Sequence, residues 1–364
     1  MAFEDESSIV KVLGVETSCD ETAAAVVEGP NVLSDVVHSQ VELHAPFGGI
    51  VPELAARDHL RNIVPVLETA LHEAGVGFDD IAGLAVTTRP GLSGALLVGI
   101  QAAQGVAWAR HKPIVGVDHL VGHLLSVFLS FDPVSENDVK FPYIGLLASG
   151  GHTALYRVEG PSAEQISELG ATRDDAAGEA FDKVAKLLGL GYPGGPVIDR
   201  LAAEGDPEGV ELAEPMNVKE SLEFSFSGLK TNVARWVTEH GPPGNDQVLR
   251  DLCASFQRRV TDSLLKKAIV AARREGIDAI VLAGGVAANR ELRQRGSMLT
   301  AGHGIRFVVP PFRACTDNAA MIAYAGWHRL KAGADDRGTL RMSPHTLLPS
   351  VTKKGRGRRP RPSA

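Results

Sequence analysis

The chain has 364 residues, of which 44% are hydrophobic and 22% charged, a composition typical of a globular protein with room for two domains. The formal net charge of -7 argues against a protein that only coats nucleic acid, and the aromatic content of 5% argues against one that mainly stacks bases on exposed rings. The three cysteines lack CxxC spacing, so we expect neither a disulfide framework nor a zinc ribbon, and a reducing compartment fits. The acidic N-terminus does not resemble a signal peptide and no apolar run reaches about 18 residues, so we expect a cytoplasmic protein.

The first part of the chain alternates short apolar runs with helical patterns. Apolar runs at 9–15 and 23–27 flank a polar turn and predict a β-hairpin. The stretch 132–140 is acidic and polar, and we expect it to link two domains. Periodicity predicts helices at 52–74, 94–111 and 119–129 and strands at 81–87 and 114–117.

The second part opens with another predicted hairpin, whose strands at 143–148 and 154–158 flank the turn SGGHT. A long helix is predicted at about 246–275, and a strand at 279–283 leads through a Gly-Gly turn into another helix. A strand at 306–309 precedes a last helix that begins near Asp317. The end of the chain contains KKGRGRRPR, which would form a disordered solubilising tail or, alternatively, a weak arm for RNA phosphates.

The two predicted hairpins match each other when the first is shifted by about 131 residues. The aligned segment contains six identical pairs, where average composition gives about one by chance. Those pairs are Gly14/Gly145, Ser18/Ser149, Thr22/Thr153, Ala23/Ala154, Val27/Val158 and Glu28/Glu159.

This repeat predicts an α/β protein with a duplicated, actin-like ATPase fold. We expect an N-terminal lobe with a helical insertion over 1–135, a C-terminal lobe over 136–345 and a basic disordered tail over 346–364. Two polar, Gly-bearing turns that face each other would cradle a polyphosphate through backbone amides. The prediction therefore places a nucleotide and metal cleft between the lobes.

Two histidines, His119 and His123, are spaced so that on a helix they share one face and can grip one metal ion. Histidines of the core or surface give the same spacing. Leu120 stands where the metalloprotease signature has Glu, which argues against that mechanism. Asp317 is the candidate third ligand of a set that suits iron or zinc, although an Asp at a helix start equally fits an N-cap.

Further polar segments suit a nucleotide substrate. Glycines at 150–151 let the backbone approach an anion, although a plain turn has the same sequence. Asp20 and Glu21 need a cation or an activated water if a phosphate lies beside them; otherwise they are solvated turn residues. Asp182 would accept hydrogen bonds from substrate hydroxyls or pair with lysine on a helix face, and a Gly-Gly pair before Asn289 suits a nucleoside.

Seven segments in order resemble the motifs of the tRNA adenosine threonylcarbamoyltransferase family, which older descriptions call O-sialoglycoprotein endopeptidases. They are VETSCDET, VDHLVGHL, ASGGHTALY, DDAAGEAFDKVAKLLGLGYPGGP, FSFSGLKT, LAGGVAAN and TDNAAMIA. The resemblance runs from about Val12 to about Met342. The chain departs from the family pattern at Ala148, where valine is frequent, and in the basic tail after Ser350.

The resemblance implies roles for the matching residues. One divalent metal, usually iron with zinc as the rival, would be held by His119, His123 and Asp317. The adenylate, an adenine nucleotide, would be bound by Leu147, Ala148, Ser149, Gly150 and Gly151, and its nucleoside and threonyl ends would be lined by Asp182, Gly195, Asp199 and Asn289. The catalytic residues next to the reacting phosphate would be Asp20 and Glu21.

The implied reaction transfers the threonylcarbamoyl group from threonylcarbamoyl-AMP to the exocyclic amine of adenosine 37 in tRNAs that read codons beginning with adenine, and AMP is released. The implied partners are tRNA, a smaller paralogue of the same fold and a small ATPase, with a homodimer as an option for the chain alone. One alternative is a metal-dependent endopeptidase. Another is a kinase or ATPase, or a nucleotide-binding scaffold, of the same fold. The histidine pair argues against a sugar kinase, because it would have no function there.

Overall fold

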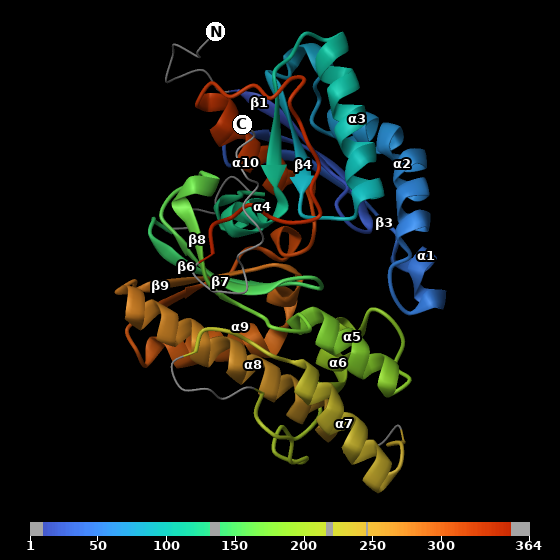
Figure 1. The fold of residues 1–364 in the computed structure, drawn as a ribbon, viewed down its shortest axis with the longest axis vertical. Helices are drawn as coiled ribbons and strands as arrows, with labels where there is room; N and C mark the ends of the chain where they lie inside the picture. Colours follow the sequence, from blue (N-terminus) through green and yellow to red (C-terminus); the bar gives the residue numbers. More distant parts are fainter. Residues whose placement is uncertain (1–9, 132–138, 216–220, 245–246, 351–364) are drawn as a thin grey trace, which may run out of the picture. The chain divides into compact units, whose positions relative to one another are not determined.

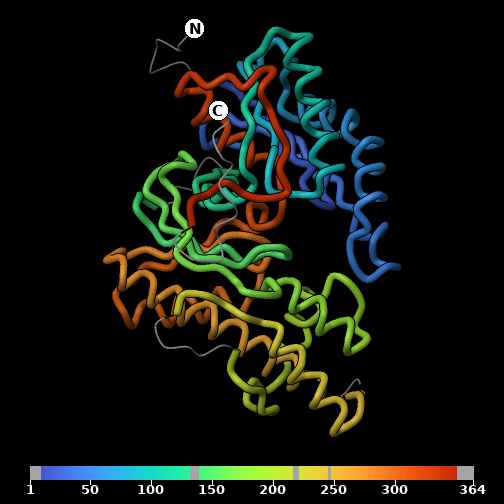
Figure 2. Tube along the Cα trace, viewed as in Figure 1, coloured from blue at the N-terminus to red at the C-terminus, as the bar shows by residue number. Residues whose placement is uncertain are grey.

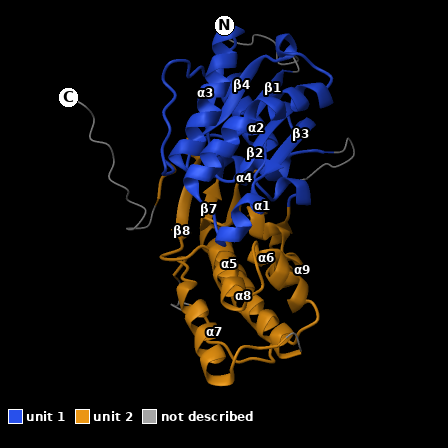
Figure 3. Ribbon diagram, turned by 90° about the vertical axis from the view of Figure 1, so that its right-hand side faces the viewer, with its two compact units in different colours: residues 1–139, 161–163, 310–347 blue, residues 140–160, 164–309, 348–364 orange. Residues whose placement is uncertain are grey.

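The chain forms two units, and each is built around its own five-stranded sheet. Figures 1 and 2 show the computed structural model, which describes residues 10–131, 139–215, 221–244 and 247–350. Unit 1 comprises residues 1–139, 161–163 and 310–347, and unit 2 comprises residues 140–160, 164–309 and 348–364 (Figure 3).

The sheet of unit 1 has the strand order β3-β2-β1-β4-β5. The pairings of β1 with β2 and of β2 with β3 are antiparallel, and those of β4 with β1 and β5 are parallel. The strands are β1 (Lys11–Glu16), β2 (Glu21–Glu28), β3 (Asn31–Ser39), β4 (Gly83–Arg89) and β5 (Ile114–Asp118). The α-helices are α1 (Val41–His44), α2 (Pro52–Glu73), α3 (Ser93–Ala109), α4 (His119–Leu125) and α10 (Ala319–Lys331). Short 3-10 turns lie at Ala45–Phe47, Phe78–Asp80, Ser126–Phe128 and Phe312–Ala314.

Alternation along β1 decides which helices cover each face of this sheet, because successive side chains point to opposite faces. Leu13 and Val15 point into a core that also buries Leu67 of α2. Gly14, between them, faces α10, and a Cβ at this position would lie only 2.4 Å from the carbonyl oxygen of Ala319. The glycine therefore lets α10 approach the sheet closely.

The predicted lobes differ from the observed units in one respect. The sequence places the boundary at 135, near the end of the first segment of unit 1, but it assigns residues 310–345 to the second lobe. In the structure the segment 310–347 belongs to unit 1, because α10 buries one face against β1, β2 and β4. Of the predicted linker and the predicted tail, residues 132–138 and 351–364 lie outside the described residues.

The sheet of unit 2 repeats this arrangement, with the order β10-β9-β6-β7-β8. Its hairpin has the register of the first: Gly14 pairs with Ala25 in unit 1, and Gly145 pairs with Tyr156 in unit 2, a shift of 131 in both strands. The predicted duplication is therefore confirmed. The strands are β6 (Tyr143–Ala148), β7 (Thr153–Val158), β8 (Ile166–Ala171), β9 (Ala279–Ala283) and β10 (Arg306–Val308). The α-helices are α5 (Ala177–Leu187), α6 (Gly194–Ala202), α7 (Ser227–His240), α8 (Gln247–Glu275) and α9 (Arg290–Ala301), with 3-10 turns at Ala163–Gln165 and Gly285–Ala288.

The sequence prediction misses elements whose apolar pattern is weak. The strands β3 and β8 were not among the predicted elements; both lie at a sheet edge and are only partly buried. The helices α6 and α7 were also not predicted, and the helix expected at 119–129 ends at Leu125 and continues as a 3-10 turn. Among the described residues, none of the helices combines the length and hydrophobicity that a bilayer crossing requires.

Candidate active site

The two histidines of α4 lie on one face of the helix, directly after β5. Asp118 caps this helix, since its carboxylate accepts the backbone N–H of Leu120 at 3.0 Å. His119 is 7% exposed and His123 is fully buried, and their rings meet edge to face with centroids 4.5 Å apart. The spacing read from the sequence thus brings both rings to the same side of one helical turn.

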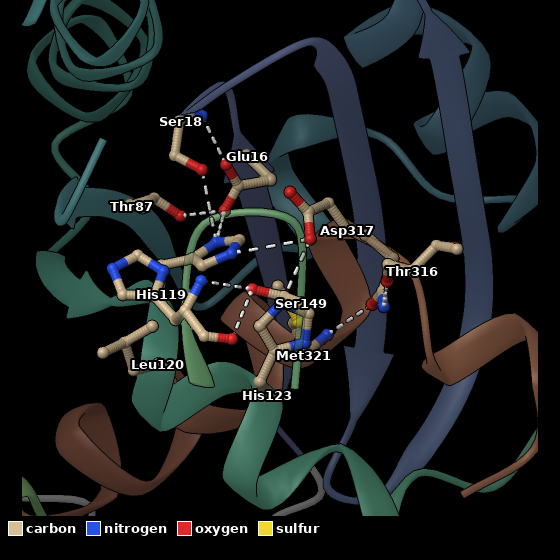
Figure 4. Close-up of polar contacts among 12 residues, drawn as sticks. Glu16, Ser18, Thr87, His119, Leu120, His123, Ser149, Thr316, Asp317 and Met321 are labelled. Atoms are coloured by element: carbon tan, nitrogen blue, oxygen red, sulfur yellow. Dashed lines mark hydrogen bonds and ion pairs between the residues drawn. The ribbon is translucent and has the colours of Figure 1, made fainter. Parts of the chain in front are cut away.

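Asp317 joins these histidines from the segment before α10. The structure excludes one of its two predicted roles, because Asn318, not Asp317, is the N-cap and accepts the backbone N–H of Met321 at 2.9 Å. The Oδ1 atom of Asp317 lies 3.0 Å from Nε2 of His123 and 3.5 Å from Nε2 of His119 (Figure 4). The carboxylate therefore faces both rings instead of the helix that follows it.

This arrangement fits a metal ion. One ligand atom from each of the three residues lies within 4.8 Å of the others. Ligand atoms bound at about 2.0–2.2 Å to one ion lie roughly 3.0–3.5 Å apart in tetrahedral or octahedral geometry. Two imidazoles and one carboxylate suit iron or zinc and leave coordination positions open.

A fourth residue of this centre, Glu16 at the end of β1, was not singled out from the sequence. Its carboxylate accepts from Nδ1 of His119 at 3.0 Å, from the hydroxyl of Thr87 at 2.5 Å and from the backbone N–H of Ser18 (Figure 4). The only signal in the sequence is a charged residue that ends an apolar run, which is equally typical of a strand that reaches solvent. Glu16 is instead 1% exposed.

The groups of the centre shift one another's pKa values. Burial lowers the pKa of His119, but the carboxylates of Asp317 and Glu16 outweigh it and raise that pKa well above the ordinary value. Burial and the charge of His119 lower the pKa of His123. Burial raises the pKa of Asp317, yet the two histidines outweigh it and hold that pKa well below its usual range. The centre therefore presents an ionised carboxylate, which suits a divalent cation.

The turn between β1 and β2 is held by α2. His59 of this helix is fully buried. Its Nε2 atom donates to the carbonyl of Cys19 at 3.0 Å, and its Nδ1 atom accepts from the hydroxyl of Thr22 at 2.8 Å. Burial lowers the pKa of His59, which keeps the ring neutral and both hydrogen bonds in place.

The two predicted catalytic acids, Asp20 and Glu21, lie in this turn and at the start of β2. Burial, together with the carboxylates of Asp317 and Asp20, raises the pKa of Glu21 to about 10. This raised pKa favours the protonated, neutral form of Glu21. The turn carries less negative charge than its sequence suggests, which reduces its repulsion of a phosphate.

The predicted substrate residues of unit 2 gather at one end of its sheet. The strand β6 ends at Ala148, and the carbonyl of Ser149 accepts the N–H of Gly178 in α5 at 3.1 Å. A Cβ at Gly178 would lie 2.7 Å from this carbonyl, so glycine allows α5 to begin against the turn. Gly284, after β9, has a φ of 86°, and a Cβ at this position would lie 2.5 Å from the carbonyl oxygen of Ala148.

Side chains of α5, α6 and α9 extend this group. Asp182 accepts the N–H of Gly194 at 2.7 Å, which fastens the start of α6 to α5. Asp199 accepts from Nε of Arg290 at 2.7 Å, which fastens α6 to the start of α9. Among the described atoms, none lies within 4 Å of a Cβ built at four glycines of this end: Gly150, Gly151, Gly195 and Gly285.

Two further predicted substrate residues, Asn289 and Leu147, also have structural roles. Asn289 is the N-cap of α9: it accepts the N–H of Leu292 at 2.9 Å and donates to Gln257 at 2.7 Å. Leu147 is fully buried within β6, so its side chain belongs to the core. Contact of either residue with substrate stays a prediction.

Asp174 is a further residue that the sequence did not indicate. Its Oδ1 atom accepts the N–H groups of Phe226 at 2.8 Å and Ser227 at 3.2 Å, and its Oδ2 atom accepts from the hydroxyls of Ser225 and Ser227. A distant carboxylate thus takes the place of an N-cap for α7, whose own capping position, Phe226, offers none.

Comparison with known proteins places the chain in a family. The family model described as TsaD, tRNA N6-adenosine threonylcarbamoyltransferase, matches residues 31–324. The chain belongs to this family. A protein of Sorangium cellulosum with that name is 63% identical over 359 residues, which cover 96% of this chain and 100% of the relative. Another, of Geobacter metallireducens, is 53% identical over 326 residues, which cover 89% and 93%. The resemblance seen in the seven motifs is confirmed, and with it the assignment to the transferases.

Solved structures share the fold at low sequence identity. Full-length HypF in its phosphate- and nucleotide-bound form has a TM-score of 0.58 and 14% identity, and the match covers 92% of this chain and 48% of HypF. Component A of the (R)-2-hydroxyglutaryl-CoA dehydratase of Acidaminococcus fermentans has a TM-score of 0.51 and 16% identity, with 88% and 98% covered. These neighbours have the actin-like ATPase fold, so the predicted fold class is confirmed.

Proposed function

We propose that the chain transfers the threonylcarbamoyl group from threonylcarbamoyl-AMP to the exocyclic amine of adenosine 37 in tRNAs that read codons beginning with adenine. The observation that carries the proposal is membership of the family over nearly the whole chain, with a relative 63% identical that is named for this activity. In this reaction the amine nitrogen bonds to the carbonyl carbon, and the bond from that carbon to the phosphate oxygen breaks. AMP leaves with the electron pair, and the amine loses one proton.

We propose that His119, His123 and Asp317 hold Fe²⁺, with zinc as the rival ion. The geometry of the donor atoms supports a metal and fits both ions. When bound, the ion would supply a Lewis acid and a template for the substrate. Asp20 and Glu21 would act beside the phosphate, and the raised pKa of Glu21, which favours its neutral form, would lessen repulsion there.

We propose that unit 2 binds the adenylate. The open Cβ positions at Gly150, Gly151 and Gly195 support this role, because a ligand can approach the backbone closely where no described atom occupies this space. The carboxylates of Asp182 and Asp199 lie at the start of α6 and next to α9, where they could also accept hydrogen bonds from hydroxyl groups of the nucleoside or threonyl part.

We propose that the chain acts in the cytoplasm with tRNA, a smaller paralogue and a small ATPase, and that it can homodimerise when alone. The three cysteines are free thiols, which suits a reducing compartment. Leu60 and Val64, one turn apart on α2, are 68% and 56% exposed and give unit 1 an apolar face for a protein partner. Glutamate at both positions should abolish co-purification with the paralogue, and retained binding would reject this face.

The test of the function is reconstitution with the presumed paralogue and ATPase, unmodified tRNA and preformed threonylcarbamoyl-AMP. The modified nucleoside is measured by mass spectrometry for the wild type, for His119→Ala and for His72→Ala, a matched change of an exposed histidine of α2. We expect modification by the wild type and His72→Ala and a collapse with His119→Ala. No modification by the wild type, with all other components shown to be active, would reject the function, and full activity of His119→Ala would reject the metal centre.

A further inference from the structure

Glu16 combines deep burial with a charge that the fold itself does not need. A buried carboxylate is costly unless hydrogen bonds satisfy it. In the second unit the residue at the same place in the repeat is Leu147: Glu16 pairs with Ala23 across the first hairpin, and Leu147 pairs with Ala154 across the second. Leu147 is fully buried as well. An apolar side chain therefore completes this strand in one copy of the fold.

The partner of Glu16 differs between the two copies in the same way. Thr87 of β4 donates to the carboxylate at 2.5 Å. The register of the parallel strands pairs Val15 with Val86 in unit 1 and Leu146 with Leu282 in unit 2, so the next residue of β9, Ala283, corresponds to Thr87. Unit 1 thus has a Glu–Thr pair where unit 2 has a Leu–Ala pair. All three candidate metal ligands belong to unit 1.

The hydrogen bond from His119 shows what the carboxylate does there. An ionised carboxylate only accepts hydrogen bonds, so Nδ1 of His119, at 3.0 Å, carries a proton. Nε2 of the same ring lies 3.5 Å from Oδ1 of Asp317, and when a metal ion binds, this nitrogen would give up its proton and offer its lone pair, while the proton at Nδ1 stays in the hydrogen bond to Glu16. We propose that Glu16 is a positioning residue that fixes the tautomer and orientation of His119, so that Nε2 is presented to the metal.

The same carboxylate reaches the turn that follows β1. Its Oε1 atom accepts the backbone N–H of Ser18, whose hydroxyl lies 3.3 Å from Nδ1 of His119. Glu16 therefore links a metal ligand to the turn that holds Asp20. His123 has no such partner, because its Nδ1 atom is buried without a hydrogen bond among the described residues. Loss of Glu16 should accordingly act on the His119 side of the centre.

The inference rests on the proposed metal centre, and its test needs neither tRNA nor the acyl donor. The affinities of the purified protein for Zn²⁺ and Fe²⁺ are measured by competition with a chelator for the wild type, Glu16→Leu and Glu16→Gln. The visible spectrum of the Co²⁺-loaded protein reports changes of the ligand set. Glu28→Gln is the matched control. Glu28, at the end of β2, forms an ion pair with Lys11 at 3.3 Å and, among the described residues, does not contact the centre.

We expect Glu16→Leu to weaken metal binding about 10- to 100-fold and to change the Co²⁺ spectrum, while Glu28→Gln leaves both as in the wild type. The Leu–Ala pair of unit 2 indicates that Glu16→Leu combined with Thr87→Ala still folds, which circular dichroism of the metal-free protein checks. If Glu16→Leu alone does not fold, the variant that combines it with Thr87→Ala decides by the same two measurements. Glu16→Gln, whose amide oxygen can still accept from Nδ1 of His119, should bind the metals more tightly than the leucine variants. Folded leucine variants that bind the metals within threefold of the wild type, with an unchanged spectrum, would overturn the proposal. If the wild type binds metal but does not modify tRNA, the proposed function is rejected, and the metal-binding measurements still test the role of Glu16.

Discussion

Replacing Gly14 by alanine tests how closely α10 must approach the sheet to hold Asp317 at the proposed metal centre. The added Cβ would lie 2.4 Å from the carbonyl oxygen of Ala319 and 2.8 Å from Cβ of Ala323. Carbon atoms in contact keep about 3.5 Å or more, so α10 has to retreat by roughly 1 Å. Overpacking of this kind costs about 1–3 kcal/mol of unfolding free energy. Because Ala319 follows Asp317 by two residues, the carboxylate should move with the helix, and we expect the metal dissociation constant to rise at least about tenfold.

The assay combines urea unfolding of the metal-free protein with chelator competition for Zn²⁺. Gly105→Ala is the control, because Gly105 is an exposed residue of α3 and, among the described atoms, none lies within 4 Å of its Cβ position. This control should gain up to about 1 kcal/mol of stability and keep its metal affinity, since alanine favours a helix over glycine. If Gly14→Ala matches the wild type in stability and metal affinity, the close approach of α10 does not position Asp317 and the reasoning is refuted.

Three further predictions concern stability, catalysis and the loop before α7. Burial raises the pKa of Asp35 from 3.8 to about 6, so stability is lost as the pH rises through 6. The unfolding free energy of Asp35→Asn should therefore rise relative to that of the wild type by about 3 kcal/mol over the whole titration, and by roughly half of this between pH 5 and pH 8. Urea unfolding at several pH values measures the difference, and a difference that does not change with pH would contradict the prediction. His59→Ala should lower kcat while leaving metal affinity unchanged, because it frees the turn that holds the two acids; transfer assays and metal titration check it, and an unchanged kcat would show that the turn holds itself. Asp174→Ala should lower the unfolding free energy by about 1–2 kcal/mol and expose the start of α7 to limited proteolysis, and Asp174→Asn should have a smaller effect. Equal resistance of the wild type and both variants to the protease would argue against the capping role.

Local patterns in the sequence determine much of this fold. The hairpins, their common offset and the helix at Pro52–Glu73 follow from period-2 and period-3.6 hydrophobicity and from glycine turns, all of which act over a few residues. The position of His119 and His123 on one side of α4 is equally local, since four residues make about one helical turn. Local patterns do not predict the edge strand β3, because a strand that is paired on one side only carries more polar residues and has a weaker apolar pattern.

The sequence leaves open whether Asp317 caps a helix or faces a metal, because both roles ask for the same residue type. The structure gives the cap to Asn318 and brings Asp317 to His123 from 194 positions away, which excludes the first role and supports the second. Glu16 looks like an ordinary strand end until the fold buries it beside His119. The return of residues 310–347 to unit 1 also depends on packing, since α10 fits only where Gly14 allows it to approach. These features arise from contacts between distant segments, whose energies depend on shape and burial that no local pattern records.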